Sequence, residues 1–405
     1  MEDSTAGIVA EYNPFHNGHQ YQIDQLRQQG VKGVIAVMSG HFLQRGEPAL
    51  ADKWQRAKWA VAGGADLVIE LPLTIACRSA DYFAAGAVRL LASLGVVTHL
   101  SFGAESALPT LEELAYLLHT AETQTLLREQ LSAGLSYPAA LQKAIEKTAP
   151  SLTSALRQPN NILGLSYLNA LNTYAPSIRP LPIARAQNAY HAITISGRLA
   201  SASAIRTTLV QKGFSAELQA VVPAATWQGL RDSHTAQQLL LDHQILSQLL
   251  FYRLRLDKIA GRLPVLGEGL ENRLEKTLSR TSSWASLLEA LKSKRYPRAR
   301  LARQLTHYLL DTPSELLHRI DREGPPYARV LAFNDAGRQL LHRCRKTSSL
   351  PLVTRVAPFF AGAPSLAVDC LRQDIKATEC YTLLTDAKNI KKGDRDFTTS
   401  PFYCK

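Results

Sequence analysis

Two histidines three residues apart, His16 and His19, have the side-chain types and the spacing to do chemistry. They follow a short apolar run at residues 5–10 and stand within the segment 13–19. Residues three apart share one face of a helix, and a helix that begins here would point unpaired backbone N–H groups at an anion. Two imidazoles at that point suit a phosphate, because hydrogen bonds held in place before the reaction stabilise charge that develops during attack.

Two other interpretations of the pair stay open from the residues alone. Histidines at a helix start can act only as capping residues, and short patterns of this kind often match by chance. A metal site is the weaker alternative, because no cysteine or carboxylate follows at a fixed ligand spacing, so we expect no metal-binding residues. The position after the first apolar strand favours a functional role, and Gly18 lets the backbone approach a nucleotide.

The segments around the histidines alternate between strand and helix patterns. Apolar runs at residues 5–10, 34–38, 66–72 and 96–102 predict buried strands, with helical patterns between them. Alternation of this kind predicts an α/β fold built on a doubly wound parallel sheet. In such a sheet ligands bind outside the carboxyl ends of the strands, which is where the two histidines stand.

The sequence predicts a division at about residue 210. Residues 1–210 would form an α/β nucleotide-binding domain, and residues 211–405 a mainly helical region, as the amphipathic run 237–256 indicates. The formal net charge of the chain is +12, and residues 211–405 hold +11 of it, with 30 Lys and Arg against 19 Asp and Glu. A positive balance of this size predicts a polyanionic partner.

Composition excludes several classes of protein. With 46% hydrophobic and 20% charged residues among 405, the chain as a whole is neither disordered nor a coiled coil. No apolar run reaches about 18 residues and no basic leader precedes one at the start, so we expect no membrane association and a cytoplasmic location. The five cysteines include no C-x-x-C pair, which disfavours a disulfide framework and a zinc knuckle.

Longer motifs carry a resemblance to a known family. The chain has no Walker A or G-x-G-x-x-G pattern, whereas its His-Asn-Gly-His turn is similar to that of the H-x-G-H nucleotidyltransferase superfamily. Five phrases resemble, in order and spacing, those of the bacterial tRNA(Met) cytidine acetate ligase family, and they stand at residues 38–49, 66–72, 101–105, 159–163 and 201–206. The likeness is dense over the first 210 residues and thin beyond. Ala104 departs from it, where a small hydroxyl residue is expected, which removes at most one hydrogen bond near the nucleotide.

The resemblance implies an ATP-dependent ligase. Such an enzyme activates acetate to acetyl-adenylate, releases pyrophosphate and acetylates the N4 amine of the wobble cytidine of elongator tRNA(Met). ATP is then a co-substrate, and Mg²⁺ is expected with it, held through phosphates and water. His16 and His19 would be catalytic, at the α-phosphate. The ATP-binding residues so implied are Gly7, Ile8, Val9, Ala10, Glu11, Tyr12, Asn13, Pro14, Phe15, His16, Asn17, Gly18, His19, Gln20, Gly103, Asn160, Asn161, Arg185, Ser203 and Arg206.

A basic run in the second half is the predicted tRNA-binding site. It places six cations in twelve residues without an acid: Lys292, Lys294, Arg295, Arg298, Arg300 and Arg303. Runs of this kind are usually solvated helix faces, but the charge of the second half and the implied tRNA favour contact with RNA phosphates. Lys53 also has two interpretations, a counter-charge for pyrophosphate or a solvated helix residue.

Two other functions stay open at this point. One is another H-x-G-H adenylyl transferase or acetate ligase, of the citrate lyase ligase type or a cofactor nucleotidylyltransferase, whose turnover would not depend on RNA. The other is a non-catalytic tRNA-binding protein. The intact His16, Gly18, His19 and Arg206 disfavour the second.

Overall fold

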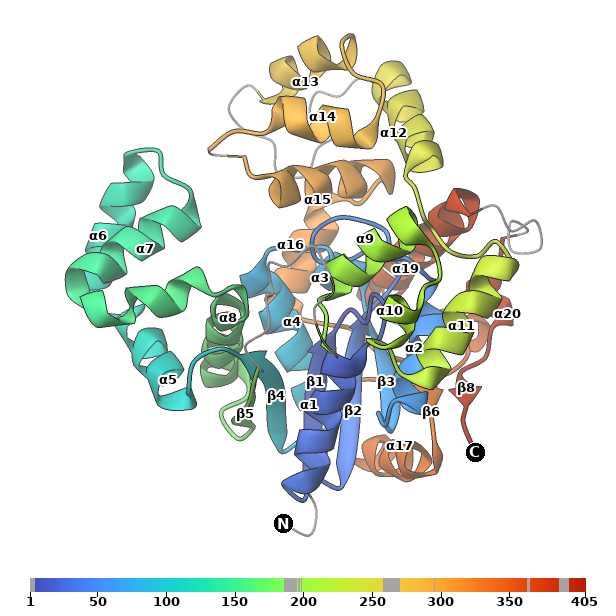
Figure 1. Cartoon of the computed structure of the whole chain (residues 1–405). Helices are drawn as coiled ribbons and strands as arrows, with labels where there is room; N and C mark the ends of the chain where they lie inside the picture. Colours follow the sequence, from blue (N-terminus) through green and yellow to red (C-terminus); the bar gives the residue numbers. More distant parts are fainter. Residues whose placement is uncertain are drawn as a thin grey trace.

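A central sheet organises the chain, in a computed structural model that describes residues 4–185, 195, 197, 199–257, 270–294, 296–362, 365–385 and 393–405. Eight strands of the described residues lie in the order β5-β4-β1-β2-β3-β6-β7, with β8 beside β6 (Figure 1). Their bounds are β1 Thr5–Ala10, β2 Gly33–Ser39, β3 Leu67–Leu71, β4 His99–Ala104, β5 Arg179–Ala184, β6 Ala328–Phe333, β7 Leu352–Val353 and β8 Phe402–Tyr403.

The first five strands confirm the predicted parallel sheet. β5, β4, β1, β2 and β3 all run parallel, so their carboxyl ends meet along one edge. The predicted and observed bounds agree closely for β1, whereas β4 begins at His99, later than the apolar run at 96–102 suggests. The fold is therefore an α/β fold with a mostly parallel sheet.

The remaining three strands come from the second half of the chain. β6 runs antiparallel to β3, and both β7 and β8 run parallel to β6. The sheet thus takes strands from both sides of residue 210, and a domain boundary at that residue stays a prediction. The second half is mainly helical apart from these strands.

Helices cover both faces of the sheet. On one face lie α1 (Asn17–Gln28), α2 (Lys53–Ala62), α9 (Ala202–Lys212), α10 (Ala216–Gln219) and α11 (Ala224–Thr235). The other core is built from α3 (Leu73–Ala76), α4 (Ala80–Ser93), α5 (Leu108–Leu117), α6 (Ala121–Ser132), α7 (Tyr137–Thr148), the 3-10 helix Pro150–Arg157, α8 (Pro159–Tyr174), α16 (Ser314–Glu323), α17 (Asp335–Thr347), α18 (Val356–Phe360) and the start of α19 (Ser365–Leu384).

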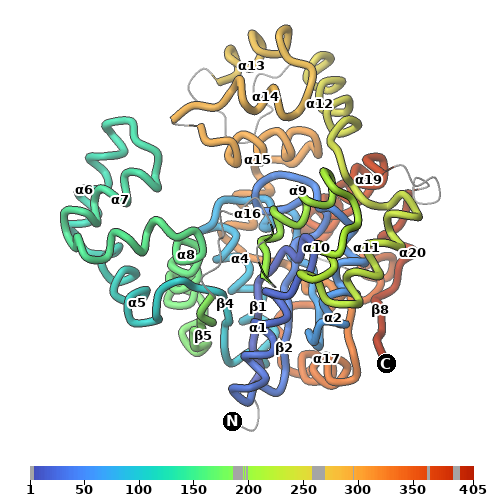
Figure 2. The backbone as a smooth tube through the Cα atoms, in the orientation of Figure 1, coloured from blue at the N-terminus to red at the C-terminus, as the bar shows by residue number. Residues whose placement is uncertain are grey.

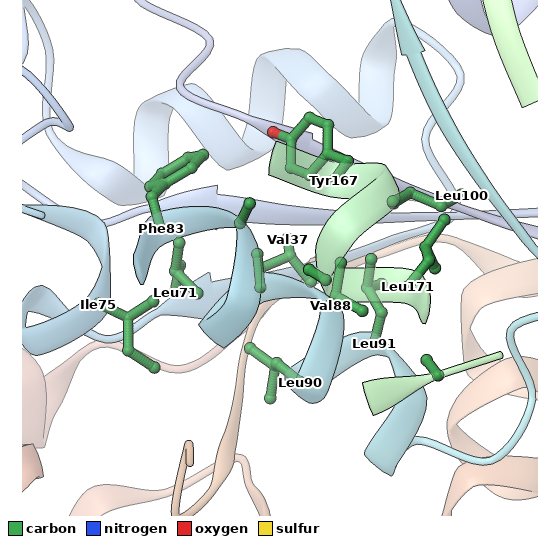
Figure 3. Close-up of a cluster of buried hydrophobic side chains, with 14 of the residues drawn as sticks. Val37, Leu71, Ile75, Phe83, Val88, Leu90, Leu91, Leu100, Tyr167 and Leu171 are labelled. Carbon is green, nitrogen blue, oxygen red and sulfur yellow. The ribbon is translucent and has the colours of Figure 1, made fainter. Parts of the chain in front are cut away.

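The alternation of side chains in β2 explains why both faces are covered. Val34 and Ala36 point into the core under α1 and α2, whereas Ile35 and Val37 point into the core under α4 and α8. Figure 3 shows the second of these cores, where Val37 packs among side chains of α4 and α8. A strand that is apolar on both faces requires a helical layer on each side, as in other parallel sheets.

A third apolar core lies outside the sheet. It joins α12 (Gln244–Leu256), α13 (Leu270–Leu278), α14 (Trp284–Leu291), α15 (Arg298–Leu309) and the end of α19. Helices α12–α15 stand apart at the top of Figure 1, and Figure 2 shows the chain leaving them to rejoin the sheet. No described helix is both long and apolar enough to cross a membrane.

A buried cluster of charges joins the two halves of the sheet. Lys53 Nζ lies 2.8 Å from Glu70 Oε1 and 2.8 Å from Asp396 Oδ1, while Arg329 Nη1 lies 2.6 Å from the same Asp396 oxygen. All four side chains are at most 4% exposed. Lys53 is therefore neither a solvated helix residue nor a counter-charge for pyrophosphate, because two buried carboxylates already neutralise it.

The charge cluster also holds the last segment of the chain. Asp396 lies in the short helix α20 (Arg395–Thr398), which precedes β8. Burial alone would raise the pKa of Asp396, but Lys53 and Arg329 outweigh that effect and lower the pKa to about 2. Arg395 adds an ion pair to Asp52, 2.9 Å long, at the start of α2.

Replacing Asp396 by asparagine tests this cluster. The variant Asp396→Asn leaves Lys53 and Arg329 with Glu70 alone, and an uncompensated buried charge should lower the free energy of unfolding by about 3–5 kcal/mol. Denaturant unfolding of the whole protein measures the change. Glu289→Gln, which breaks the exposed pair with Lys292, should change it by less than about 1 kcal/mol. Equal effects of the two variants would show that the buried ion pairs contribute no more to the free energy of unfolding than the exposed pair does.

Candidate active site

The two histidines form the first turn of α1 together. His16 is the N-cap residue, in extended conformation (φ −139°, ψ 172°), and its Nδ1 accepts a hydrogen bond from Gly18 N at 3.0 Å. His19 Nδ1 accepts one in return from His16 N at 3.2 Å. The two rings stack with centroids 3.7 Å apart and an interplanar angle of 21°. The pair is thus a capping box in which imidazoles replace the usual hydroxyl and carboxylate.

This capping arrangement fixes the tautomer of both rings. Because each Nδ1 accepts a backbone N–H, each neutral imidazole carries its proton on Nε2. Burial, together with the charges of Arg185 and Arg206, lowers the pKa of His16 to about 3. Burial, His16 and Arg185 lower the pKa of His19 well below its usual value. Both rings are therefore neutral Nε2–H donors at neutral pH.

Aromatic side chains and one glycine keep the rings in place. Tyr12 contacts the His19 ring edge-on at a centroid distance of 4.8 Å, and Phe15 lies 5.5 Å from the same ring. Both aromatic residues are buried. A Cβ at Gly18 would lie 2.9 Å from His16 Cε1, so a glycine is required for the His16 ring to fold back over the helix start. Gly18 thus accommodates the imidazole, and its predicted role in letting the backbone approach a nucleotide stays a prediction.

The turn before α1 is anchored by α9 and by the segment after α10. Asn13 Oδ1 accepts a hydrogen bond from Leu50 N at 2.7 Å, and Asn13 O accepts one from Arg206 Nη1 at 2.7 Å. Asn17 Nδ2 donates to Ala220 O at 2.9 Å. The other residues that the sequence assigned to ATP here lie in β1 (Gly7, Ile8, Val9 and Ala10), in the turn (Glu11 and Pro14) and in α1, where Gln20 donates to Asp24.

Two arginines flank the histidines. Arg185 directly follows β5 and Arg206 lies in α9, and both charges act on His16. Ser201 is the N-cap of α9, so Ser203 is not needed as a cap, and its Oγ lies 3.4 Å from Arg206 Nη2. Histidines, arginines and Ser203 thus converge where the parallel strands end, which is the place predicted from the sequence.

The β4 side of the site is a network around Arg185. Its Nη1 donates to Asn160 Oδ1 at 2.9 Å, and Asn160 Nδ2 donates to Glu105. A Cβ at Gly103 would lie 3.2 Å from Arg185 Cγ, so the arginine stem packs against the strand there. The expected grouping of Gly103, Asn160 and Arg185 in space is observed.

Asn161 differs from its neighbour. Its Oδ1 accepts from Glu105 N and Ser106 N at 3.0 and 3.1 Å, and its Nδ2 donates to Ser106 Oγ and Ala155 O at 2.9 and 3.1 Å. An amide side chain has two donor hydrogens and two acceptor lone pairs, and all four are occupied here. Asn161 therefore holds the turn after β4, and its side-chain amide has no hydrogen-bonding capacity left, so a contact of this residue with ATP stays a prediction.

A loop at residues 40–49, the 40–49 loop, links this site to α15. Glu11 Oε1, at the end of β1, accepts from Gln44 N at 3.0 Å. On its other side, Gly46 O accepts from Thr306 Oγ1 at 2.8 Å. Gly46 has φ +78°, and a Cβ there would lie 2.3 Å from Arg303 N, so only glycine permits this contact.

The 40–49 loop also occupies part of the predicted RNA-binding run. Arg298 pairs with Glu47 at 3.3 Å, and Arg303 Nη1 donates to Gln44 O at 3.3 Å. Arg300 lies over the Tyr296 ring, 4.9 Å from its centroid. Of the other three cations, Lys292 and Lys294 lie before α15 and Arg295 lies outside the described residues. The run is thus divided: Arg298 and Arg303 contact the 40–49 loop, whereas Lys292 and Lys294 are exposed.

Sequence analysis gave no role to Arg56. This buried guanidinium donates to the carbonyl oxygens of Ala51, Glu11 and Gly40, which ties the 40–49 loop to the end of β1. In the sequence, the role of Arg56 is indicated only by its position as a basic residue among the apolar residues of α2. Among the described residues no group of three or more His, Cys, Asp or Glu side chains could hold a metal ion.

Comparisons with known proteins agree with this geometry. The family model described as HIGH Nucleotidyl Transferase matches residues 3–396. The chain is 37% identical to the tRNA(Met) cytidine acetate ligases of Acetivibrio thermocellus (97% of this chain and 98% of that protein covered) and Clostridium kluyveri (98% and 98%). Its structure is similar to those of Thermotoga maritima TmcAL in the apo form and bound with alpha-thio ATP, with TM-scores of 0.93 and 0.91, 31% identity and 99% of both chains covered.

The protonation state of His16 is directly testable. With a pKa lowered to about 3, the ring should stay a neutral Nε2–H imidazole at pH 5, where a histidine with the ordinary pKa near 6.5 is mostly protonated. Long-range ¹H–¹⁵N correlation spectra report both tautomer and charge, and a His16→Asn sample assigns the signals. A midpoint near pH 6.5 would contradict the buried, arginine-flanked site. Because the unfolded chain binds this proton and the folded chain does not, the neutral ring makes stability fall as the pH drops from 6.5 towards 3.

Proposed function

Because this chain belongs to the tRNA(Met) cytidine acetate ligases within the HIGH nucleotidyl transferase family, we propose that it activates acetate with ATP and acetylates a cytidine of tRNA(Met). The observation that carries the proposal is the pair of neutral imidazoles at the start of α1 with Arg185 and Arg206 beside them. These groups offer hydrogen bonds and positive charge at one point, as a reacting phosphate requires.

The first step is attack of an acetate oxygen on the α-phosphorus. The new oxygen–phosphorus bond forms as the bond to pyrophosphate breaks, and negative charge builds up on the α-phosphate oxygens. His16 and His19 donate their Nε2 protons as hydrogen bonds to this charge, without transferring them. The capping bonds at Nδ1 hold both rings in position beforehand, so little reorganisation is needed when the charge develops.

The two arginines act on the leaving group in this proposal. Arg206 with Ser203, and Arg185 with Asn160, offer donors for the β- and γ-phosphates. Asn161 contributes by holding the turn that carries Glu105 and Ser106. No side chain has to act as a nucleophile, because acetate is already a carboxylate.

The second step transfers the acetyl group to RNA. The N4 amine of the wobble cytidine of elongator tRNA(Met) attacks the carbonyl carbon, AMP leaves, and the amine loses one proton. We assign RNA binding to α12–α15 and the basic run around Lys292, Lys294 and Arg300, in the half of the chain that carries most of the net charge.

Mg²⁺ would enter with the nucleotide. The described residues offer no ready-made cage of carboxylates, which fits an ion held mainly by phosphate oxygens and water, the usual state of Mg²⁺ with ATP. Bound in this way it supplies positive charge to the triphosphate. A cytoplasmic location, where ATP and tRNA are present, is part of the same proposal.

The first half-reaction is expected to need no RNA, because its residues lie in β1, α1, β5 and α9. Acetate-dependent exchange of labelled pyrophosphate into ATP should therefore proceed with protein, ATP, Mg²⁺ and acetate alone. Mass spectrometry of nucleosides after adding elongator tRNA(Met) should then show N4-acetylcytidine. Exchange that strictly required tRNA would contradict a site assembled in advance.

The donor role of the imidazoles has its own test. His19→Asn keeps an acceptor near the position of Nδ1 but removes the Nε2–H donor, and it should lower acetate-dependent exchange by about 10²–10³. His16→Asn should behave alike. The matched control is His342→Asn on the exposed surface of α17, which should exchange like the wild type. Near-normal exchange in both site variants would mean that the histidines are only capping residues.

A further inference from the structure

A hollow on the described surface lies beside α13, at the opposite end of the molecule from α1 (Figure 1). It measures about 550 Å³ and is lined by Asn272, Arg273, Lys276, Thr277, Arg280, Thr281 and Ala290. None of these residues belongs to the basic run predicted from the sequence. We propose that this hollow binds backbone phosphates of the tRNA, as a second RNA contact beyond that run.

The charges of α13 are sorted around its axis. Leu270, Leu274 and Leu278 face the apolar core of α12–α15. At 100° per residue, Arg273 and Lys276 fall on one flank of this apolar stripe, and Glu271 and Glu275 fall on the opposite flank, while Arg280 lies in the turn that follows α13. The cations therefore gather at the hollow without a carboxylate among its lining residues.

The three cations differ in what holds them. Arg273 Nη2 donates to Ala290 O at 2.9 Å and to Lys292 O at 3.2 Å, so it fixes the floor of the hollow against the end of α14. Among the residues that the structure describes, Lys276 and Arg280 have no acidic partner, and both are exposed. A pair of exposed cations beside a fixed one offers phosphate contacts that cost no existing ion pair.

The hydroxyl groups that line the hollow also suit RNA. Thr277 Oγ1 donates to Arg273 O at 2.7 Å and Thr281 Oγ1 donates to Thr277 O at 3.0 Å. Each hydroxyl already donates its hydrogen to a backbone carbonyl but keeps lone pairs on its oxygen. It can therefore accept a hydrogen bond from a ribose 2′-OH, the group that distinguishes RNA from DNA. Small-molecule pockets of this volume are lined mainly by apolar and aromatic side chains, whereas Ala290 is the single apolar residue among those that line this hollow, and none of them is aromatic.

The hollow is continuous with the predicted RNA-binding run. The carbonyl that Arg273 holds belongs to Lys292, the first cation of that run. A strand of RNA can therefore pass from Lys292 and Lys294 to Lys276 and Arg280 over one helical body. The inference rests on the proposed function, since it extends the surface for the same tRNA.

The test removes the two unpaired cations together. Lys276→Ala with Arg280→Ala should weaken binding of elongator tRNA(Met) transcript and reduce the slope of log K against log salt by about 1.4–1.8, because each phosphate contact contributes about 0.7–0.9. Fluorescence anisotropy measures both the affinity and the slope at salt concentrations from about 50 to about 200 mM, the range over which phosphate contacts change affinity strongly. The conservative double variant Lys276→Arg with Arg280→Lys should bind like the wild type.

A charge-matched control excludes a general field effect. Arg345→Ala with Lys346→Ala also removes two exposed cations from a last helical turn, on α17 at the opposite end of the molecule (Figure 1). It should leave the salt slope unchanged, and acetate-dependent pyrophosphate exchange should be normal in all variants. An unchanged slope in the α13 variant, or an equal loss in the α17 control, overturns the inference while tRNA acetylation by the wild type stands. Absence of acetylation and of tRNA binding by the wild type overturns the proposed function itself.

Discussion

The site depends on one requirement of helix α1: the backbone N–H groups of its first turn need acceptors. Two imidazoles meet that need, and in doing so they lose the freedom to choose a tautomer. The same two hydrogen bonds that begin the helix thus leave Nε2–H groups pointing away from it. Burial and the nearby Arg185 and Arg206 then keep the rings uncharged. The arrangement that caps the helix is therefore also the one that we propose for phosphate recognition.

How much of this the sequence predicts depends on the range of the contacts. β1, α1 and the histidine pair are local patterns, so their position and chemistry are readable from a few residues. β6 pairs with β3 across more than half the chain, and an apolar run such as 328–333 does not reveal its partner. The burial of Lys53 is equally invisible, since one of the two carboxylates that neutralise it, that of Asp396, comes from a remote segment. Asn161 matches the motif, but only the hydrogen bonds of the structure show that its side-chain amide has no donor or acceptor left.

The 40–49 loop explains why the two parts of the molecule are not independent. The loop is hydrogen-bonded to Glu11 beside the histidines and to Thr306 within α15. Arg56 holds its start by donating to the carbonyl oxygen of Gly40. The loop therefore links α15 to the end of β1 through hydrogen bonds on both of its sides. The basic run is divided for the same reason, because Arg298 and Arg303 contact this loop whereas Lys292 and Lys294 are exposed.

The buried charge cluster has a consequence for biosynthesis. Lys53 leaves the ribosome early, whereas Asp396 is added more than 340 residues later, which at 5–20 residues per second is a delay of about 17–70 s. Until Asp396 is added, Lys53 and Arg329 lack one of the two carboxylates that pair with them in the folded protein, so the sheet around β3 cannot reach its final stability before then. The two histidines, Arg185 and Arg206 all lie within the first 210 residues, but the sheet that positions them is complete only when β8 has been added.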